Sequence, residues 1–345
     1  MKECKFIIHL LYIVLLVTSC QKAPRIQGFS PDLLTETTET LNYSTFVDSI
    51  QYIHLETTDD CLIGKITDAI FTTNYILILD EQKQTIWIFN QNGKFLNKIS
   101  RKGNGPEEYY YLYKLEFDKK NNQIAALDLW NHSILYYDLN GLFIRKVKFE
   151  MVISDFKIIP QGGYIISNAG ESKPEAGIYL TDKNGKIIQN LIKKKPEHML
   201  SYTAQKELYS FGDTISIITP NFENEIYHFI NNKMILVYPF TFYPLLKNTY
   251  KEDISKQYLE DFIRNVHIEG PQWIFSIYWC AKHDIRNFLY SKEKKQYWIG
   301  NSLVNDIDGI KSNGKTSIVE NNLFVFWCYS EDPDENPILQ VLHLK

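Results

Sequence analysis

The segment Ile76–Ile99 has the sequence ILILDEQKQTIWIFNQNGKFLNKI, and a second segment of the same design, IAALDLWNHSILYYDLNGLFIRKV, follows at Ile124–Val147. Each copy contains an apolar strand that ends in Asp, a polar loop, a second apolar strand, an Asn-Gly turn and a third strand. Asp80 and Asp128 are 48 residues apart, and the other matching positions keep that offset. A repeat of this length, built from strands and tight hairpins, is typical of a β-propeller blade.

The chain has room for six such units. The segment from Phe46 to Lys345 spans 300 residues, a little over six times the repeat. The first two units begin near Gly64 and Leu112, and four looser copies follow. Aromatic residues make up 14% of the chain, which favours pleated strands over helices. We therefore expect an all-β fold, a six-bladed β-propeller of four-stranded antiparallel blades.

Two further segments stand apart from the repeat. Val47–Leu55 has the pattern of a strand with no complete blade before it, and Ile338–Leu344 is a final strand. We expect the two to pair and close the ring, because such pairing removes an exposed sheet edge. Within 244–270, Ile254 and Tyr258 begin an apolar series at i, i+4 spacing. This series predicts an inserted α-helix between blades four and five.

The N-terminus has the features of a targeting segment. Lys2 and Lys5 precede Phe6–Val17, an apolar run shorter than the roughly 20 residues of a membrane-spanning helix. The run ends in VTSC, which is typical of a bacterial lipobox, with the cysteine to be lipidated at Cys20. A plain secretory signal with a chance cysteine is the alternative. The predicted segments are a signal peptide at 1–19, the lipidated cysteine and a flexible tether at 20–45, and the propeller at 46–345.

Composition excludes several classes of function. The net charge of −4 and a pI near 6.1 provide no positive field for nucleic acid. Cys61, Cys280 and Cys328 are too few and too far apart for a disulfide framework or a zinc site, so we expect free thiols. The chain contains no HExxH, GxSxG, P-loop, dinucleotide or EF-hand motif. Neither a metal nor another cofactor is predicted, although a propeller can assemble a site from distant blades.

Several motifs together resemble one protein family. They are the lipobox with Cys20, the opening SIQYIHLET at Ser49–Thr57, the segment SRKGNGPEEYYYL at Ser100–Leu112, and the NGKF turn. This combination resembles the six-bladed β-propeller lipoproteins of Bacteroidetes, relatives of the NHL-repeat propellers, over nearly the whole mature chain. At Glu107 this chain departs from the family, which favours a further glycine there. The resemblance implies a lipid-anchored protein of the cell envelope, with the outer membrane favoured and its orientation open. It implies no particular activity, since NHL-type relatives include binders and enzymes.

Blade topology narrows the location of a ligand site. In a four-stranded up-and-down blade, the loop between strands two and three opens on the same face as the crossover to the next blade. We call this face the rim; the Asn-Gly hairpins lie on the opposite face. Binding residues of propellers tend to gather on rim loops. The candidate ligand-binding residues of the rim are Arg101, Asn104, Glu108, Trp130, His132, His198, His283 and Arg286.

The first functional hypothesis is a monomeric, non-enzymatic module that binds a protein, peptide or glycan at the rim. Arg101 and the glycines beside Asn104 would offer a cation and backbone N–H groups to an anionic ligand. Those glycines would alternatively serve only the bend of the crossover. Trp130 stands in a polar loop and suits stacking on a sugar ring or a peptide side chain. It would alternatively cover the end of its blade.

The second hypothesis is a propeller enzyme, a lyase or hydrolase that acts on a saccharide or peptide. His132, His198 or His283 would act with rim carboxylates as acid and base. This hypothesis requires a cluster of titratable groups at the mouth of the central channel.

Overall fold

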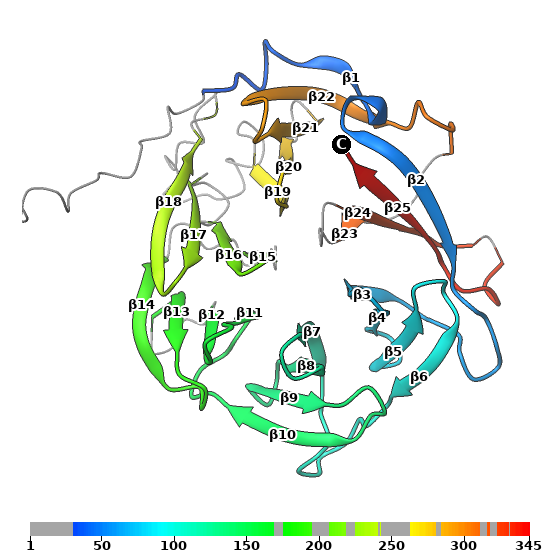
Figure 1. The fold of residues 1–345 in the computed structure, drawn as a ribbon, viewed down its shortest axis with the longest axis vertical. Coiled ribbons are helices and arrows are strands. Elements are labelled where there is room, and N and C mark those ends of the chain that lie inside the picture. The colour runs from blue at the N-terminus through cyan, green and yellow to red at the C-terminus, as the bar shows by residue number, and fades with distance from the viewer. Residues whose placement is uncertain are drawn as a thin grey trace, which may run out of the picture.

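The computed structural model describes residues 30–168, 175–194, 207–218, 225–240, 242, 263–280, 284–310, 316–317, 323–330 and 332–345. Six sheets surround a common axis (Figure 1). In each sheet the antiparallel strands follow one another from the axis outward. The chain is thus a six-bladed β-propeller, as the repeat predicted, and the described residues contain no α-helix.

The first three blades take their strands in chain order. Blade one contains β3 (Ile66–Phe71), β4 (Tyr75–Asp80), β5 (Thr85–Asn90) and β6 (Phe95–Ile99). Blade two contains β7 (Leu112–Asp118), β8 (Gln123–Asp128), β9 (Ser133–Tyr137) and β10 (Phe143–Lys148). Blade three contains β11 (Asp155–Ile158), β12 (Tyr164–Asn168), β13 (Gly177–Thr181) and β14 (Ile187–Lys193).

Blade four also takes its strands in chain order, whereas blades five and six each include a strand from the N-terminal part of the chain. Blade four contains β15 (Leu208–Phe211), β16 (Thr214–Ile218), β17 (Glu225–Ile230) and β18 (Lys233–Pro239). Blade five contains β19 (Ile263–Glu269), β20 (Trp273–Cys280), β21 (Asp284–Ser291), β22 (Gln296–Val304) and, outside them, β1 (Thr38–Asn42). Blade six contains β23 (Thr316–Ser317), β24 (Leu323–Cys328), β25 (Ile338–Leu344) and β2 (Val47–His54).

Blade six joins the two ends of the chain. β2 is its outermost strand and pairs antiparallel with β25, from Val47 opposite Leu344 to His54 opposite Ile338. β25 therefore has a partner on both edges, β24 on one side and β2 on the other. Main-chain hydrogen bonds close the ring at this blade.

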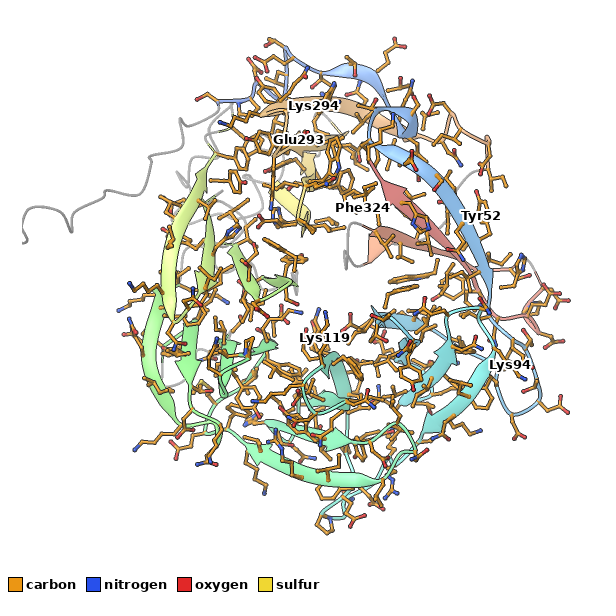
Figure 2. The ribbon with its side chains drawn as sticks, viewed as in Figure 1. Tyr52, Lys94, Lys119, Glu293, Lys294 and Phe324 are labelled. Atoms are coloured by element: carbon orange, nitrogen blue, oxygen red, sulfur yellow. The ribbon has the colours of Figure 1, made fainter. Side chains whose placement is uncertain are left out.

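The middle strands are buried on both faces, which explains their continuous apolar sequences. In β4, Leu77 and Leu79 pack with residues of blade two, whereas Ile76 and Ile78 pack with residues of blade six. All four side chains are fully buried. Figure 2 shows Phe324 of β24, which packs with aromatic residues of blade five, and Tyr52 on the outer circumference. Apolar side chains of each blade thus pack against both neighbouring blades.

The folded region begins earlier than the sequence predicted. β1 runs parallel to β22, with Thr38 opposite Gly300, and Leu33 is fully buried. The threonines that indicated a tether are β-branched residues that also fit an edge strand. The predicted tether therefore extends too far, because residues 30–45 belong to the fold. Residues 1–29, with Cys20, lie outside the described residues.

The predicted helix at 244–270 is wrong for its C-terminal part. β19 covers Ile263–Glu269 and is the axis-side strand of blade five, with Val266 opposite Ile277. The unpaired edge of β20 supplies a complete set of hydrogen-bond partners there, and this tertiary contact overrides the apolar i, i+4 spacing. Residues 243–262 lie outside the described residues.

The closure of the ring can be tested at two matched glycines. Gly93 and Gly141 occupy the same turn in blades one and two, with φ of +80° and +81°. A Cβ at Gly93 would lie 2.2 Å from the carbonyl oxygen of His54 at the end of β2, whereas at Gly141 the nearest atom would be 3.5 Å away. Both Ala substitutions add left-handed strain of about 1 kcal/mol, but only Gly93→Ala also displaces β2.

We expect urea denaturation to show that Gly141→Ala lowers the free energy of unfolding by about 1 kcal/mol, and Gly93→Ala by at least about 2 kcal/mol. Equal losses in the two variants would mean that the contact between this turn and β2 contributes nothing to the closed ring.

Candidate functional site

Aspartates at the ends of two strands fix the loops of the rim. Asp80 ends β4, and its carboxylate accepts hydrogen bonds from the N–H groups of Gly64 in the crossover (2.7 Å) and Gln82 in the following loop (3.0 Å). Asp128 ends β8 and accepts from the crossover N–H of Tyr110 at 2.9 Å. Crossover and loop therefore share one face in blades one and two. The apolar-strand-plus-Asp signature in the repeat reflects this hydrogen bonding.

A cleft of about 540 Å³ opens on the rim between the crossover that follows blade one and the outer part of blade two. Lys146 and Lys148 of β10 lie along it, and neither has a carboxylate partner among the described residues. The Lys146 ammonium donates instead to the carbonyl oxygen of Glu108 at 3.0 Å. The lining residues are Asn104, Gly105, Pro106, Asn131, Phe143, Lys146 and Lys148.

Trp130 stands next to this cleft. It directly precedes the lining residue Asn131, and 65% of its surface is exposed. The Asn131 side chain donates to Asp128 at 2.7 Å, so the loop that carries the indole is tied to the end of β8. The loop that borders the cleft thus carries an exposed indole as a stacking surface, and the cleft's lysines, which form no salt bridge among the described residues, provide positive charge.

Arg101 and Glu108, two of the predicted residues, shape the crossover. The Arg101 guanidinium lies 3.2 Å from the carboxylate of Glu107. Glu108 accepts a hydrogen bond from the N–H of Gly105 at 2.8 Å, which closes a tight loop around Asn104. The cation and the N–H group that were expected to bind an anion are thus occupied by the chain's own carboxylates, Glu107 and Glu108. Of the predicted crossover residues Arg101, Asn104 and Glu108, Asn104 is the one that lines the cleft.

His132 occupies a strained turn position. Its φ is +47°, and Gln84 at the matching place in blade one has φ +50°. The His132 carbonyl oxygen accepts the N–H of Phe149 at 2.9 Å. Its backbone therefore joins the loop to the next crossover.

Of the remaining predicted residues, Arg286 does not join this group. Arg286 belongs to β21 in blade five, on the opposite side of the ring (Figure 1). Its Nε donates to the carbonyl oxygen of Leu33 at 2.9 Å, which holds the N-terminal segment against the blade. His198 and His283 lie outside the described residues.

Charged groups line the inner edges of blades one to four, which the repeat pattern did not reveal. The Asp68 carboxylate in β3 accepts the N–H of Leu115 in β7 at 2.9 Å. The Asp155 carboxylate in β11 likewise accepts the N–H of Leu208 in β15 at 3.2 Å. Both N–H groups lie on strand edges that face the axis, where no further strand pairs with them. We call these groups and their ionic partners the axis cluster. The axis cluster could have been predicted from charged residues that interrupt apolar strand sequences, such as Asp68 in β3.

Two buried ion pairs belong to the axis cluster, one between axis-side strands and one that reaches it from Lys194, just after the outermost strand β14. Lys157 of β11 pairs with Glu116 of β7, and Lys194 pairs with Glu207 at 2.6 Å. Burial lowers the pKa of Lys157, but the charges of Glu116 and Asp155 raise it by more, so the pKa lies above its ordinary value. These lysines connect blade two to blade three and blade three to blade four.

Glu207→Gln would leave the Lys194 ammonium, 5% exposed, without its counter-charge. We expect a loss of about 3–5 kcal/mol in the free energy of unfolding, because a buried charge without a partner is costly. The neighbouring Lys193 pairs with Glu175 in the open, with 65% and 64% of the two side chains exposed. Glu175→Gln is therefore the matched control, and we expect it to leave the free energy of unfolding nearly unchanged. Similar losses from the two variants in chemical denaturation would contradict a structural role for the axis cluster.

A second buried cluster joins blades four and five. Glu269 is fully buried and accepts hydrogen bonds from His228 Nε2 at 2.8 Å, Lys292 Nζ at 2.5 Å and the Ser216 hydroxyl. The Lys292 ammonium also lies 4.4 Å from the centre of the Phe211 ring. Ser216 and His228 each bond to the glutamate, which differs from a nucleophile–base pair, where the two would bond to each other. The cluster therefore fastens two blades.

The pKa of Glu269 makes this cluster sensitive to acid. Burial raises this pKa, but the hydrogen bond from His228 and the charge of Lys292 lower it by more, to about 2. Because the pKa of Glu269 is lower in the folded than in the unfolded chain, its ionisation stabilises the fold at any pH above the unfolded pKa of 4.5. This stabilisation is lost as the pH falls from 4.5 toward 2. We expect wild type to lose about 3 kcal/mol more than Glu269→Gln over this range, measured by denaturation at each pH. Parallel pH profiles would rule out this linkage.

The described residues hold no cluster of three or more His, Cys, Asp or Glu side chains suited to a metal ion. Among them, Cys61 and Cys328 are free thiols, and burial raises the pKa of Cys61 to about 11. No helix within the described ranges is both long and apolar enough to cross a membrane.

Comparison with known proteins agrees with the fold. A candidate exported protein of Bacteroides fragilis has a solved structure with a TM-score of 0.75 and 20% identity, over 92% of this chain and all of the other. A DUF4221-family protein of Bacteroides vulgatus has a TM-score of 0.55 and 9% identity, over 87% of this chain and 97% of the other. No curated protein is significantly similar in sequence. The model of the family described as "Domain of unknown function (DUF4934)" matches residues 30–341. The chain therefore belongs to the DUF4934 family.

Proposed function

We propose that this protein is a binding module of the cell envelope that holds an acidic glycan or peptide in the rim cleft beside blade two. The observation that carries the proposal is the cleft itself, which is lined by two lysines that have no carboxylate partner among the described residues and whose bordering loop carries an exposed tryptophan at position 130. A β-propeller fold is suited to presenting loops on a rigid ring.

Positive charge at the cleft would select the ligand. The Glu107 carboxylate neutralises Arg101, but Lys146 and Lys148 keep their charges for an incoming group. Asn104 and Asn131 add amide donors and acceptors along the same cleft. Trp130 would stack on a sugar ring or an aromatic side chain, which gives contact area that does not depend on charge. Affinity should therefore fall, without vanishing, as the salt concentration rises.

The envelope location rests on the N-terminal sequence. The apolar run Phe6–Val17 and the following lipobox support export and lipidation at Cys20. The structural similarity to a candidate exported protein of Bacteroides fragilis is consistent with export. We place the propeller on a lipid anchor, in the outer membrane by resemblance, as a monomer whose partner is neither nucleic acid nor a bound cofactor.

The enzyme alternative depends on the axis cluster. It requires titratable groups close together near the axis, and Asp68, Glu116 and Asp155 meet that condition. However, these carboxylates already accept hydrogen bonds from main-chain N–H groups or a lysine of the next blade. A catalytic acid or base needs access to a substrate proton, so the binding module is the better-supported function.

Trp130 and Leu142 provide a matched test of the proposed cleft. Both belong to blade two and are 65% and 63% exposed, but Leu142 lies in the Asn-Gly turn on the opposite face. We expect Trp130→Ala to weaken binding about tenfold, in keeping with the loss of one aromatic contact, and Leu142→Ala to leave it unchanged. The measurement is binding of the purified full chain to arrays of acidic and neutral glycans and of acidic peptides. Equal binding by wild type and Trp130→Ala to every retained ligand would refute the assignment.

A further inference from the structure

A second pocket, of about 150 Å³, lies on the face opposite the rim, between blades two and three. The turn between β7 and β8 forms one side, through Lys120 and Asn121. The turn between β11 and β12, from Ile159 to Gly163, forms the other, and Lys183 of the β13–β14 turn reaches the same pocket. None of the predicted rim residues belongs to this pocket, so it is separate from the rim cleft.

Arg145 is fixed in this pocket by two tyrosines. Its guanidinium lies 3.5 Å from the centre of the Tyr136 ring, on the neighbouring strand β9. Its Nη1 also donates to the hydroxyl of Tyr164, across the blade boundary, at 3.3 Å. The two tyrosine hydroxyls are 2.8 Å apart, and both residues are at most 2% exposed. The guanidinium is therefore held in place before any ligand arrives.

The pocket carries an excess of positive charge. Lys120, Arg145 and Lys183 line it, and Asp118 is its one carboxylate. The Asp118 oxygens accept hydrogen bonds from the main-chain and side-chain nitrogens of Asn121, at 3.1 and 2.8 Å. Among the described residues, Arg145 has no carboxylate partner. A half-buried cation without a counter-charge is unfavourable, and an anion in the pocket would relieve that cost.

The lining of the pocket indicates the class of anion. A guanidinium presents planar pairs of N–H donors that match the two oxygens of a carboxylate. Ile158, Pro160 and the tyrosine rings add apolar surface, which suits an organic body rather than a bare inorganic ion. A cavity of about 150 Å³ admits one ring of benzene size. We propose that this pocket binds the carboxylate of a small organic acid no larger than a single ring, with Arg145 as its anchor.

Saturation-transfer NMR on the purified full chain can test this site. The probes are benzoate and glucuronate, with benzyl alcohol and methyl glucoside as neutral counterparts and inorganic phosphate as the bare anion. We expect at least one carboxylate to bind wild type, its neutral counterpart to bind at least tenfold more weakly, and Arg145→Met to lose the signal. Lys94→Met is the control. Lys94 is an exposed lysine that follows the Asn-Gly turn of blade one, on the outer side of that blade and outside the pocket (Figure 2). It should bind like wild type.

Two further variants keep the test decisive if Arg145→Met does not fold. Arg145→Lys keeps the charge but loses the paired donors, and Lys183→Met changes an exposed side chain at the edge of the pocket. Each should bind the carboxylate several-fold more weakly than wild type while melting at the same temperature. Unchanged binding in both variants, no carboxylate binding by wild type, or preference for phosphate would overturn the proposal.

Discussion

Each blade of this ring depends on its two neighbours. Alternate side chains of β4 pack on opposite sides, Leu77 and Leu79 toward blade two and Ile76 and Ile78 toward blade six. A single sheet of this kind would expose one or both of its apolar faces to water, so the blades can be stable only as a closed set. The whole fold therefore depends on closure of the ring. β2 closes the ring by pairing with β25, from the other end of the chain.

Closure also determines where function can lie. At the inner edges, Asp68 and Asp155 satisfy N–H groups of the next blade, and Lys157 neutralises the carboxylate of Glu116. These charges belong to the framework. The loops and the outermost strand β10 carry less of the packing, so they are free to present Trp130 and Lys148 at the rim and Arg145 on the opposite face. The same ring can thus support two separate binding surfaces.

The sequence predicted the features that repeat within one blade. The strand that ends in Asp80 or Asp128 and the turns at Gly93 and Gly141 recur every 48 residues, so the blade, its count and its rim loops followed from local pattern. The pairing of Val47–His54 with Ile338–Leu344 was also predicted, but other features that depend on distant partners were not visible. Thr38 pairs with Gly300, Arg286 bonds to Leu33, and β19 takes its form from β20, so composition or spacing alone misassigned these segments. Within the candidate site, Trp130 and Asn104 were identifiable from local chemistry, whereas Lys146 and Lys148 become part of the cleft only through the fold.

The proposed function requires that the rim beside blade two, and not the face with the small pocket, meets the glycan or peptide. Asn104 lines the rim cleft, and Asn140 is equally a surface asparagine, in the Asn-Gly turn on the other face. A photo-crosslinking amino acid placed at either position in intact cells would capture the molecule that lies against it, whatever the chemical identity of that molecule. We expect a discrete crosslinked glycan or peptide product from position 104 that is absent from position 140. The same product from both positions, or one from position 140 alone, would contradict it.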